Sequence, residues 1–163
     1  MTATPHSFSI ALPNAAATDD IGIGLGMAVR VGDVVCLRGD LGAGKTALTR
    51  AAILARLAEN GMAEDIPSPT FTLIQTYHAD IPIWHADLYR LSDEEEVWEL
   101  GLVDAFHDAA CFIEWPDRLG SLLPARRLEI SLTMAGDGRN LTAAAYGDAW
   151  SHITAVWEGH NAH

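Results

Sequence analysis

The chain has 163 residues, of which 49% are hydrophobic and 20% are charged. This length and composition allow one sizeable core and exclude wholesale disorder. The formal net charge of -12 repels phosphate backbones. It therefore excludes tight nucleic-acid binding by the isolated chain and leaves any such contact to a partner protein.

The sequence shows no sign of export or of membrane insertion. Its first ten residues lack the basic region and the long apolar run of a signal peptide. No apolar stretch approaches the length of a membrane span. Cys36 and Cys111 each lie inside an apolar run, which is typical of buried thiols rather than of a disulfide or a metal pair. We therefore expect a cytoplasmic protein without a membrane segment.

The N-terminal part predicts two strands and two helices. Residues 7–12 alternate as a strand does, and Thr18 before two aspartates predicts an N-cap for a helix that continues to about Val29. The glycines at 22, 24 and 26 either weaken this helix or let it pack closely on a neighbour. An apolar run over 34–39 predicts a strand, and strong helix formers predict a helix over 44–57.

The remaining elements complete an α/β pattern. Residues 71–77, 81–87 and 109–115 read as strands, and Ser92 with Glu95 reads as a helix capping box. A turn over 135–139 predicts a hairpin between two further strands, 127–134 and 140–146. This order predicts one α/β domain over 1–147, with a mixed, mostly parallel central sheet flanked by helices. Residues 148–163 are weakly patterned and are assigned to a C-terminal tail.

A glycine-rich loop lies between the strand at 34–39 and the helix that follows it. Gly39, Gly44, Lys45 and Thr46 satisfy the phosphate-binding pattern G-x-x-x-x-G-K-[ST], known as the P-loop. Glycines let phosphate oxygens approach the backbone, and successive N–H groups with the helix N-terminus attract anions. Lysine supplies a compact positive charge, and the threonine hydroxyl can bind magnesium. The sequence therefore predicts a single P-loop NTPase domain.

Lys45 is the only lysine in the chain, and nine arginines supply the other positive charges. A lysine kept at this position alone fits a narrow phosphate cradle better than an arginine would. The guanine-selective motif N-K-x-D needs a second lysine, so the sequence favours ATP over GTP.

Two carboxylates follow apolar strands and are candidates for the metal and water positions. Glu114 ends the run 109–114, and Asp87 ends the run 81–87. We expect Glu114 to lie on the metal side because its strand is more apolar, and Asp87 to orient the attacking water. The alternative for each is an acidic residue that caps a strand at the surface.

Weaker candidates lie nearby. Thr70 lies in a loop about two dozen residues after the P-loop and can sense a γ-phosphate, as a switch loop does. The alternative is an ordinary turn, in which Ser-Pro-Thr is common. His85 can hydrogen-bond Asp87 or be purely structural. Trp115 can belong to the core or help to hold the site, and Arg139 is by default an exposed cation.

Five motifs in order carry a resemblance to a known family. They are GDLGAGKT at 39–46, SPTFTL at 68–73, HADLYRL at 85–91, ELGL at 99–102 and IEWP at 113–116. Together they resemble the bacterial TsaE family of tRNA threonylcarbamoyladenosine biosynthesis ATPases, over about Leu12 to Leu141. The P-loop alone marks only a P-loop protein, whereas the ordered set is far more specific.

The resemblance implies a function and partners. It implies slow, magnesium-dependent ATP hydrolysis by an accessory protein that acts with TsaB and TsaD. Their joint product is threonylcarbamoyladenosine beside the anticodon of tRNA, with the transfer chemistry in TsaD and tRNA reached through the complex.

The resemblance also implies roles for individual residues. Thr46 and Glu114 fall on magnesium positions, and Lys45, Thr70 and Asp87 fall on catalytic ones. Nucleotide contacts fall on Asp40, Leu41, Gly42, Ala43, Gly44, Lys45, Thr46, Ala47, Arg139 and, beside the adenine, Ala15.

Two other functions compete with this one. A small-molecule kinase would use the same P-loop, but it usually closes an arginine-rich lid over the phosphates, and the arginines here are scattered. A nucleotide-gated binding module with negligible turnover would differ only in its rate of phosphate release.

Overall fold

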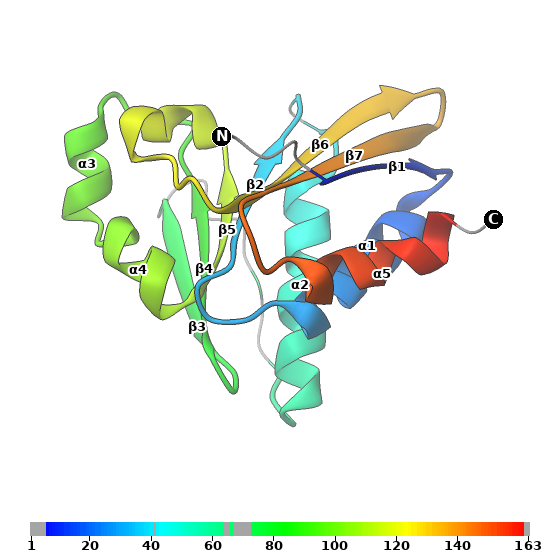
Figure 1. Ribbon diagram of the computed structural model, residues 1–163, viewed down its shortest axis with the longest axis horizontal. Coiled ribbons are helices and arrows are strands. Elements are labelled where there is room, and N and C mark those ends of the chain that lie inside the picture. Colours follow the sequence, from blue (N-terminus) through cyan, green and yellow to red (C-terminus); the bar gives the residue numbers. More distant parts are fainter. Residues whose placement is uncertain (1–5, 41, 64–65, 67–72, 162–163) are drawn as a thin grey trace.

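The fold is a seven-stranded sheet with helices on both faces (Figure 1). The computed structural model describes residues 6–40, 42–63, 66 and 73–161. The strands are β1 (His6–Leu12), β2 (Val34–Arg38), β3 (Ile74–His78), β4 (Pro82–Asp87), β5 (Ala110–Glu114), β6 (Arg127–Ala135) and β7 (Gly138–Tyr146). The helices are α1 (Ala15–Ala28), α2 (Lys45–Glu59), α3 (Glu94–Glu99), α4 (Leu102–Asp108), the 3₁₀ helix η1 (Pro116–Leu122) and α5 (Ser151–Asn161).

The sheet has the order β1-β7-β6-β2-β5-β4-β3 and is mixed. Strands β6, β2, β5 and β4 are parallel neighbours, whereas β7 and β3 run antiparallel to the strands beside them. Strand β1 is antiparallel to β7 and so runs with the central four. Five of the seven strands therefore share one direction, which confirms the predicted mixed, mostly parallel sheet.

Helices α1, α2 and α5 cover one face of the sheet, and α3 and α4 cover the other (Figure 1). Side chains of a strand alternate between faces. Val35 and Leu37 of β2 accordingly pack in the core under α1 and α2, while Val34 and Cys36 pack in the core under α4. Burial on both faces explains why β2 and β5 are continuous apolar runs.

Two predicted helix starts are wrong by a few residues. Helix α1 begins at Ala15, because the side chain of Asn14 accepts a hydrogen bond from the Ala17 N–H at 2.9 Å and caps the helix first. Thr18 is therefore a buried residue inside the helix rather than its cap. At α3 the cap is Asp93, one residue later than the predicted Ser92, and its side chain accepts from the Glu96 N–H.

Residues 151–161, which the sequence analysis assigned to a tail, form helix α5. Ile153 and Trp157 belong to the core under α1, and Trp157 meets Phe8 of β1 edge to face. Trp150, Ile153 and Trp157 follow the i, i+3, i+7 spacing of a buried helical face. That spacing was the signal for α5 that the sequence analysis missed.

Other predictions can be compared directly with the structure. The hairpin between β6 and β7 is confirmed, with its turn at Gly136 and Asp137. Cys36 and Cys111 are buried free thiols, and burial raises the pKa of each to about 12. Within the described part of the chain, no helix combines the length and apolar character needed to cross a bilayer. Leu41, Thr70 and the predicted strand start at 71–72 lie outside the described residues.

Candidate functional site

The site begins where strand β2 gives way to helix α2. Gly44 is the N-cap of α2 and has a φ of 108°, a left-handed conformation that favours glycine. The first N–H groups of a helix have no partner within it, and the helix dipole adds partial positive charge there. The 15-residue helix α2 therefore presents an anion-binding end at this loop.

Lys45 lies over the loop rather than in solvent. Its ammonium donates to the carbonyl of Gly39 and lies 4.0 Å from the centroid of the Trp115 ring. Burial lowers the pKa of Lys45, an effect that the nearby carboxylates of Glu114 and Asp87 oppose. The positive charge is thus held by the loop and by an aromatic face at the position that the P-loop pattern predicts.

The two candidate carboxylates lie side by side. The parallel register of β4 and β5 places Asp87 opposite Glu114 at the ends of both strands. The hydroxyl of Thr46 lies 2.9 Å from Oε1 and 3.0 Å from Oε2 of Glu114, so it can donate to either oxygen. Threonine hydroxyl and carboxylate oxygens are ligands that magnesium prefers. The structure therefore brings the two predicted metal-side residues into contact.

His85 also contacts Glu114. Its Nε2 lies 2.7 Å from Glu114 Oε2, and its side chain is fully buried. Of the two alternatives for His85, a hydrogen bond to Asp87 and a structural role, the structure replaces the first by a contact with Glu114. Asp87 is a near neighbour of His85 along β4, but the hydrogen bond crosses to β5.

Asp87 is buried at the edge of the same pocket. It accepts a hydrogen bond from the N–H of Tyr89 at 3.1 Å. Burial raises the pKa of Asp87, and the neighbouring charge of Glu114 raises it further. A carboxylate that binds its proton more strongly than usual is suited to accept one from water.

Arg139 reaches the loop from β7. Its Nε donates to the carbonyl of Ala43 at 3.1 Å, and its Nη2 donates to the carbonyl of Gly42 at 3.3 Å. It is therefore a brace on the loop backbone rather than the free surface cation that its sequence context suggested. The sequence could not show this contact, because the three residues meet only through the pairing of distant strands.

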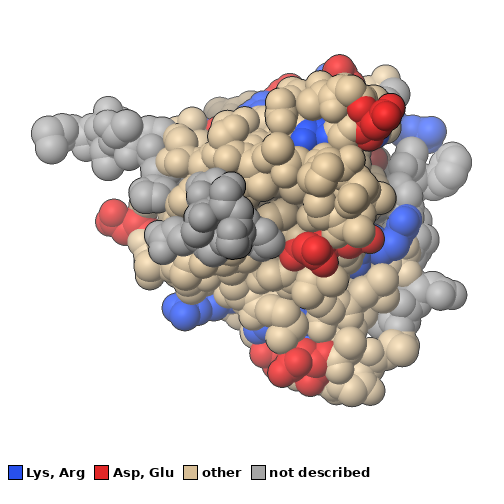
Figure 2. Space-filling model, turned by 90° about the vertical axis from the view of Figure 1, so that its right-hand side faces the viewer, with Lys and Arg blue, Asp and Glu red and all other residues tan. Residues whose placement is uncertain are grey.

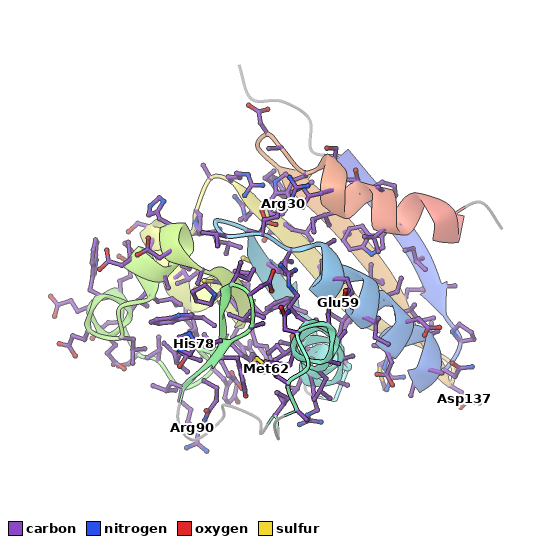
Figure 3. The ribbon with its side chains drawn as sticks, turned by 90° about the horizontal axis from the view of Figure 1, so that it is seen from below. Arg30, Glu59, Met62, His78, Arg90 and Asp137 are labelled. Carbon is purple, nitrogen blue, oxygen red and sulfur yellow. The ribbon has the colours of Figure 1, made fainter. Side chains whose placement is uncertain are left out.

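Two hollows meet at this loop. One, of about 240 Å³, is lined by Lys45, Thr46, Asp87 and Glu114 among others. The other, of about 280 Å³, is lined by residues of α1, the loop and the β6–β7 hairpin, among them Ala15, Asp137 and Arg139. Gly44 and Ala47 line both hollows. In Figure 3 Asp137 marks the hairpin end of this groove, beside the start of α1.

Comparisons with known proteins agree with this geometry. The family model described as threonylcarbamoyl adenosine biosynthesis protein TsaE matches residues 12–141. The chain belongs to the TsaE family.

Individual TsaE relatives cover most of the chain. The Bacillus subtilis protein named tRNA threonylcarbamoyladenosine biosynthesis protein TsaE is 39% identical over 134 residues, which is 80% of either chain. The Rickettsia bellii protein of the same name is 42% identical over 67% of this chain and 74% of its own. A crystal structure of Bacillus subtilis YdiB superposes with a TM-score of 0.79 at 28% identity, covering 98% of this chain and 99% of that one.

The TsaE match covers the loop, both carboxylates and Arg139, and it ends before α5. The structure gathers most of the predicted site residues around one groove: Ala15, Gly42, Ala43, Gly44, Lys45, Thr46, Ala47, Asp87, Glu114 and Arg139. Asp40 lies in the loop itself and lines a separate hollow with Gly39 and Met134. The TsaE fold, P-loop and groove together are those of a nucleotide-binding protein.

Proposed function

We propose that this chain binds and slowly hydrolyses ATP with magnesium, as an accessory protein of tRNA threonylcarbamoyladenosine biosynthesis. TsaE membership supports the pathway. The contact of Thr46 with Glu114, beside the only lysine, is the observation that carries the activity. Its partners are TsaB and TsaD in the cytoplasm, and tRNA is reached through that complex.

The site residues fit magnesium and triphosphate. Thr46 and Glu114 would hold the ion, which takes its remaining ligands from phosphate and water. When bound, the ion neutralises charge that develops on the phosphates. Lys45 and the N–H groups at the start of α2 bind the phosphate oxygens, and Asp87 orients the attacking water. Thr70 is the proposed switch-loop residue, and Ala15 and Arg139 flank the nucleoside.

Three of the described arginines form ion pairs within the fold, which speaks against a small-molecule kinase with an arginine-rich lid. A phosphate lid needs several arginines near the pocket. Arg126 instead binds Asp33, Arg127 binds Glu129, and Arg56 binds Asp80. These ion pairs hold the guanidinium groups in the framework of the fold.

Nucleotide binding and turnover of the Lys45→Ala variant test the proposal. Loss of a charge-assisted hydrogen bond costs about 1.5–3 kcal/mol, which is about 10–150-fold in affinity. We expect that loss for ATP in calorimetry and no detectable phosphate release. Arg30→Ala, which removes an exposed charge before β2 at the opposite end of the strand, is the matched control and should behave as wild type.

Phosphate release by wild type, measured with and without TsaB and TsaD, separates an ATPase from a binding module without turnover. Turnover by Lys45→Ala at the wild-type rate would refute the assignment.

A further inference from the structure

We propose that His85 is a positioning residue that holds Glu114 in the orientation needed for magnesium. The inference deepens the proposed function and rests on it. The observation that carries it is the 2.7 Å contact between His85 Nε2 and Glu114 Oε2, inside a fully buried part of the sheet.

The contact fixes one end of the carboxylate. His85 lies on β4 opposite Phe112 of β5, two residues before the Asp87–Glu114 pair. Its ring therefore approaches Glu114 from within the sheet, whereas Thr46 approaches from helix α2. Thr46 on α2 and His85 on β4 thus fix the orientation of the Glu114 carboxylate without a bound ion.

The surroundings of the ring determine which nitrogen carries the proton. An ionised carboxylate only accepts hydrogen bonds. His85 Nδ1 is buried and has no hydrogen-bond partner among the described residues. A proton on Nδ1 would leave that N–H unsatisfied and would set a bare Nε2 against a carboxylate oxygen. Donation of the Nε2–H to Glu114 therefore fits the surroundings of the ring.

The Thr46 hydroxyl cannot replace this support. A hydroxyl has one proton, and in the proposed site its oxygen faces the ion. Glu114 is 2% exposed, so water cannot supply the missing donor easily. Without the histidine, the carboxylate would turn away from the geometry that the ion requires. Loss of such a supporting hydrogen bond typically costs about 10–100-fold in metal affinity.

A histidine that only fills space would give a different result from one that donates. His85→Phe keeps an aromatic ring and removes the donor. His85→Gln places an amide N–H near the position of Nε2, whereas the shorter His85→Asn places it near Nδ1, out of reach of Glu114. Ile83→Val is the packing control, because Ile83 is buried two residues earlier on the same face of β4.

The experiment measures ADP affinity of the full chain by calorimetry, in magnesium and in EDTA, together with Mn²⁺ binding in the presence of ADP by electron paramagnetic resonance. In His85→Phe and His85→Asn we expect the metal-dependent gain in ADP affinity to fall about 10–100-fold, with affinity in EDTA unchanged. His85→Gln should keep most of the gain, and Ile83→Val should keep all of it. If His85→Phe does not fold, the Gln and Asn pair provides the same comparison.

Two outcomes overturn the inference. One is a full metal-dependent gain in His85→Phe or His85→Asn. The other is an equal loss of affinity in magnesium and in EDTA, which would make His85 a packing residue. Failure of wild type to bind ADP under either condition would instead overturn the proposed function itself.

Discussion

The carboxyl group of Asp87 is more costly to keep ionised than an exposed one. Burial raises its folded-state pKa above the unfolded value, so the folded protein binds this proton more tightly than the unfolded chain does. By linkage, the ionised group lowers stability as pH rises through that pKa. A functional site that carries such a cost is common in enzymes.

Replacing Asp87 by asparagine should therefore separate stability from activity. We expect Asp87→Asn to unfold at a higher urea concentration than wild type at pH 7, with a difference that shrinks as pH falls and the wild-type carboxyl gains its proton. Phosphate release should fall about 100-fold or more, because the group that we propose to orient water is lost. A variant that is less stable at pH 7, or that keeps full turnover, would contradict the role given to Asp87.

Among the individual residues of the site, the charged groups could be predicted from the sequence, but the side chains that contact and orient them could not. Lys45, Asp87 and Glu114 could be identified because each follows a pattern local to its own segment. The contact of His85 with Glu114 depends on the register of β4 against β5. The brace from Arg139 to the loop depends on the path of β7, which no local pattern encodes.

Helices α1 and α2 approach each other closely where α1 carries glycine. A β-carbon at Gly26 would lie 2.0 Å from the carbonyl oxygen of Ala52, and one at Gly22 would lie 2.5 Å from that of Leu48. These obstacles are backbone atoms and cannot rotate away. Of the two readings of the glycines in α1, close packing on a neighbour is therefore confirmed.

Alanine at Gly26 should destabilise the protein more than alanine at Gly24. Gly26→Ala gains about 1 kcal/mol of helix propensity but forces the helices apart, and we expect a net loss of about 2 kcal/mol. Gly24→Ala is the comparison variant, because the nearest atom to its β-carbon would be a side-chain methyl of Val156, at 2.6 Å, rather than a backbone atom. We expect it to lose clearly less stability than Gly26→Ala, because a side chain gives way more easily than a backbone carbonyl. Urea unfolding measures both, and equal stabilities would refute the close contact.

Helix α5 should contribute strongly to stability through Trp157. This side chain is 0% exposed, whereas Trp98 on α3 is 58% exposed. Trp157→Ala should cost about 3–5 kcal/mol, while Trp98→Ala should change stability by less than about 0.5 kcal/mol. Thermal unfolding followed by circular dichroism would compare them. A mild Trp157→Ala variant would mean that α5 is dispensable for the fold.

The starts of α1 and α3 show what limits prediction of elements. Asn14 and Thr18 both suit an N-cap, as do Ser92 and Asp93, and the choice between such neighbours depends on tertiary packing. The helix after the loop was simpler, because strong helix formers continue from Lys45 to Glu59. The existence of these helices could therefore be predicted from the sequence, whereas the residues at which α1 and α3 begin could not.

The charge of the whole molecule opposes direct contact with tRNA. The net charge is -12, and on the face in Figure 2 the basic side chains are scattered rather than gathered into a stripe. Phosphate contacts by clustered Lys and Arg supply most non-specific affinity. We expect no shift of tRNA by the isolated chain in a native gel at physiological salt. Sub-micromolar binding would contradict this expectation.

Fold class could be predicted from the sequence, but strand order could not. The run 34–39, its glycine loop and the following helix indicate a parallel α/β core by themselves. The pairing of β1 with β7, which sets Ile10 beside Leu141, joins segments that are about 130 residues apart in the sequence. Alternating residues 7–12 would suit either edge of such a sheet, so only the tertiary structure distinguishes them.

That pairing has a consequence for synthesis on the ribosome. Strand β1 is made before β2 and β7 follows β6, and both neighbours of β2 are translated after the loop that follows it. While the chain is being elongated, strand β2 and its P-loop are therefore present before β5 and β6, the two strands that pair with β2. The groove gains Arg139 only when the β6–β7 hairpin emerges, so the groove is complete only after that hairpin has been made.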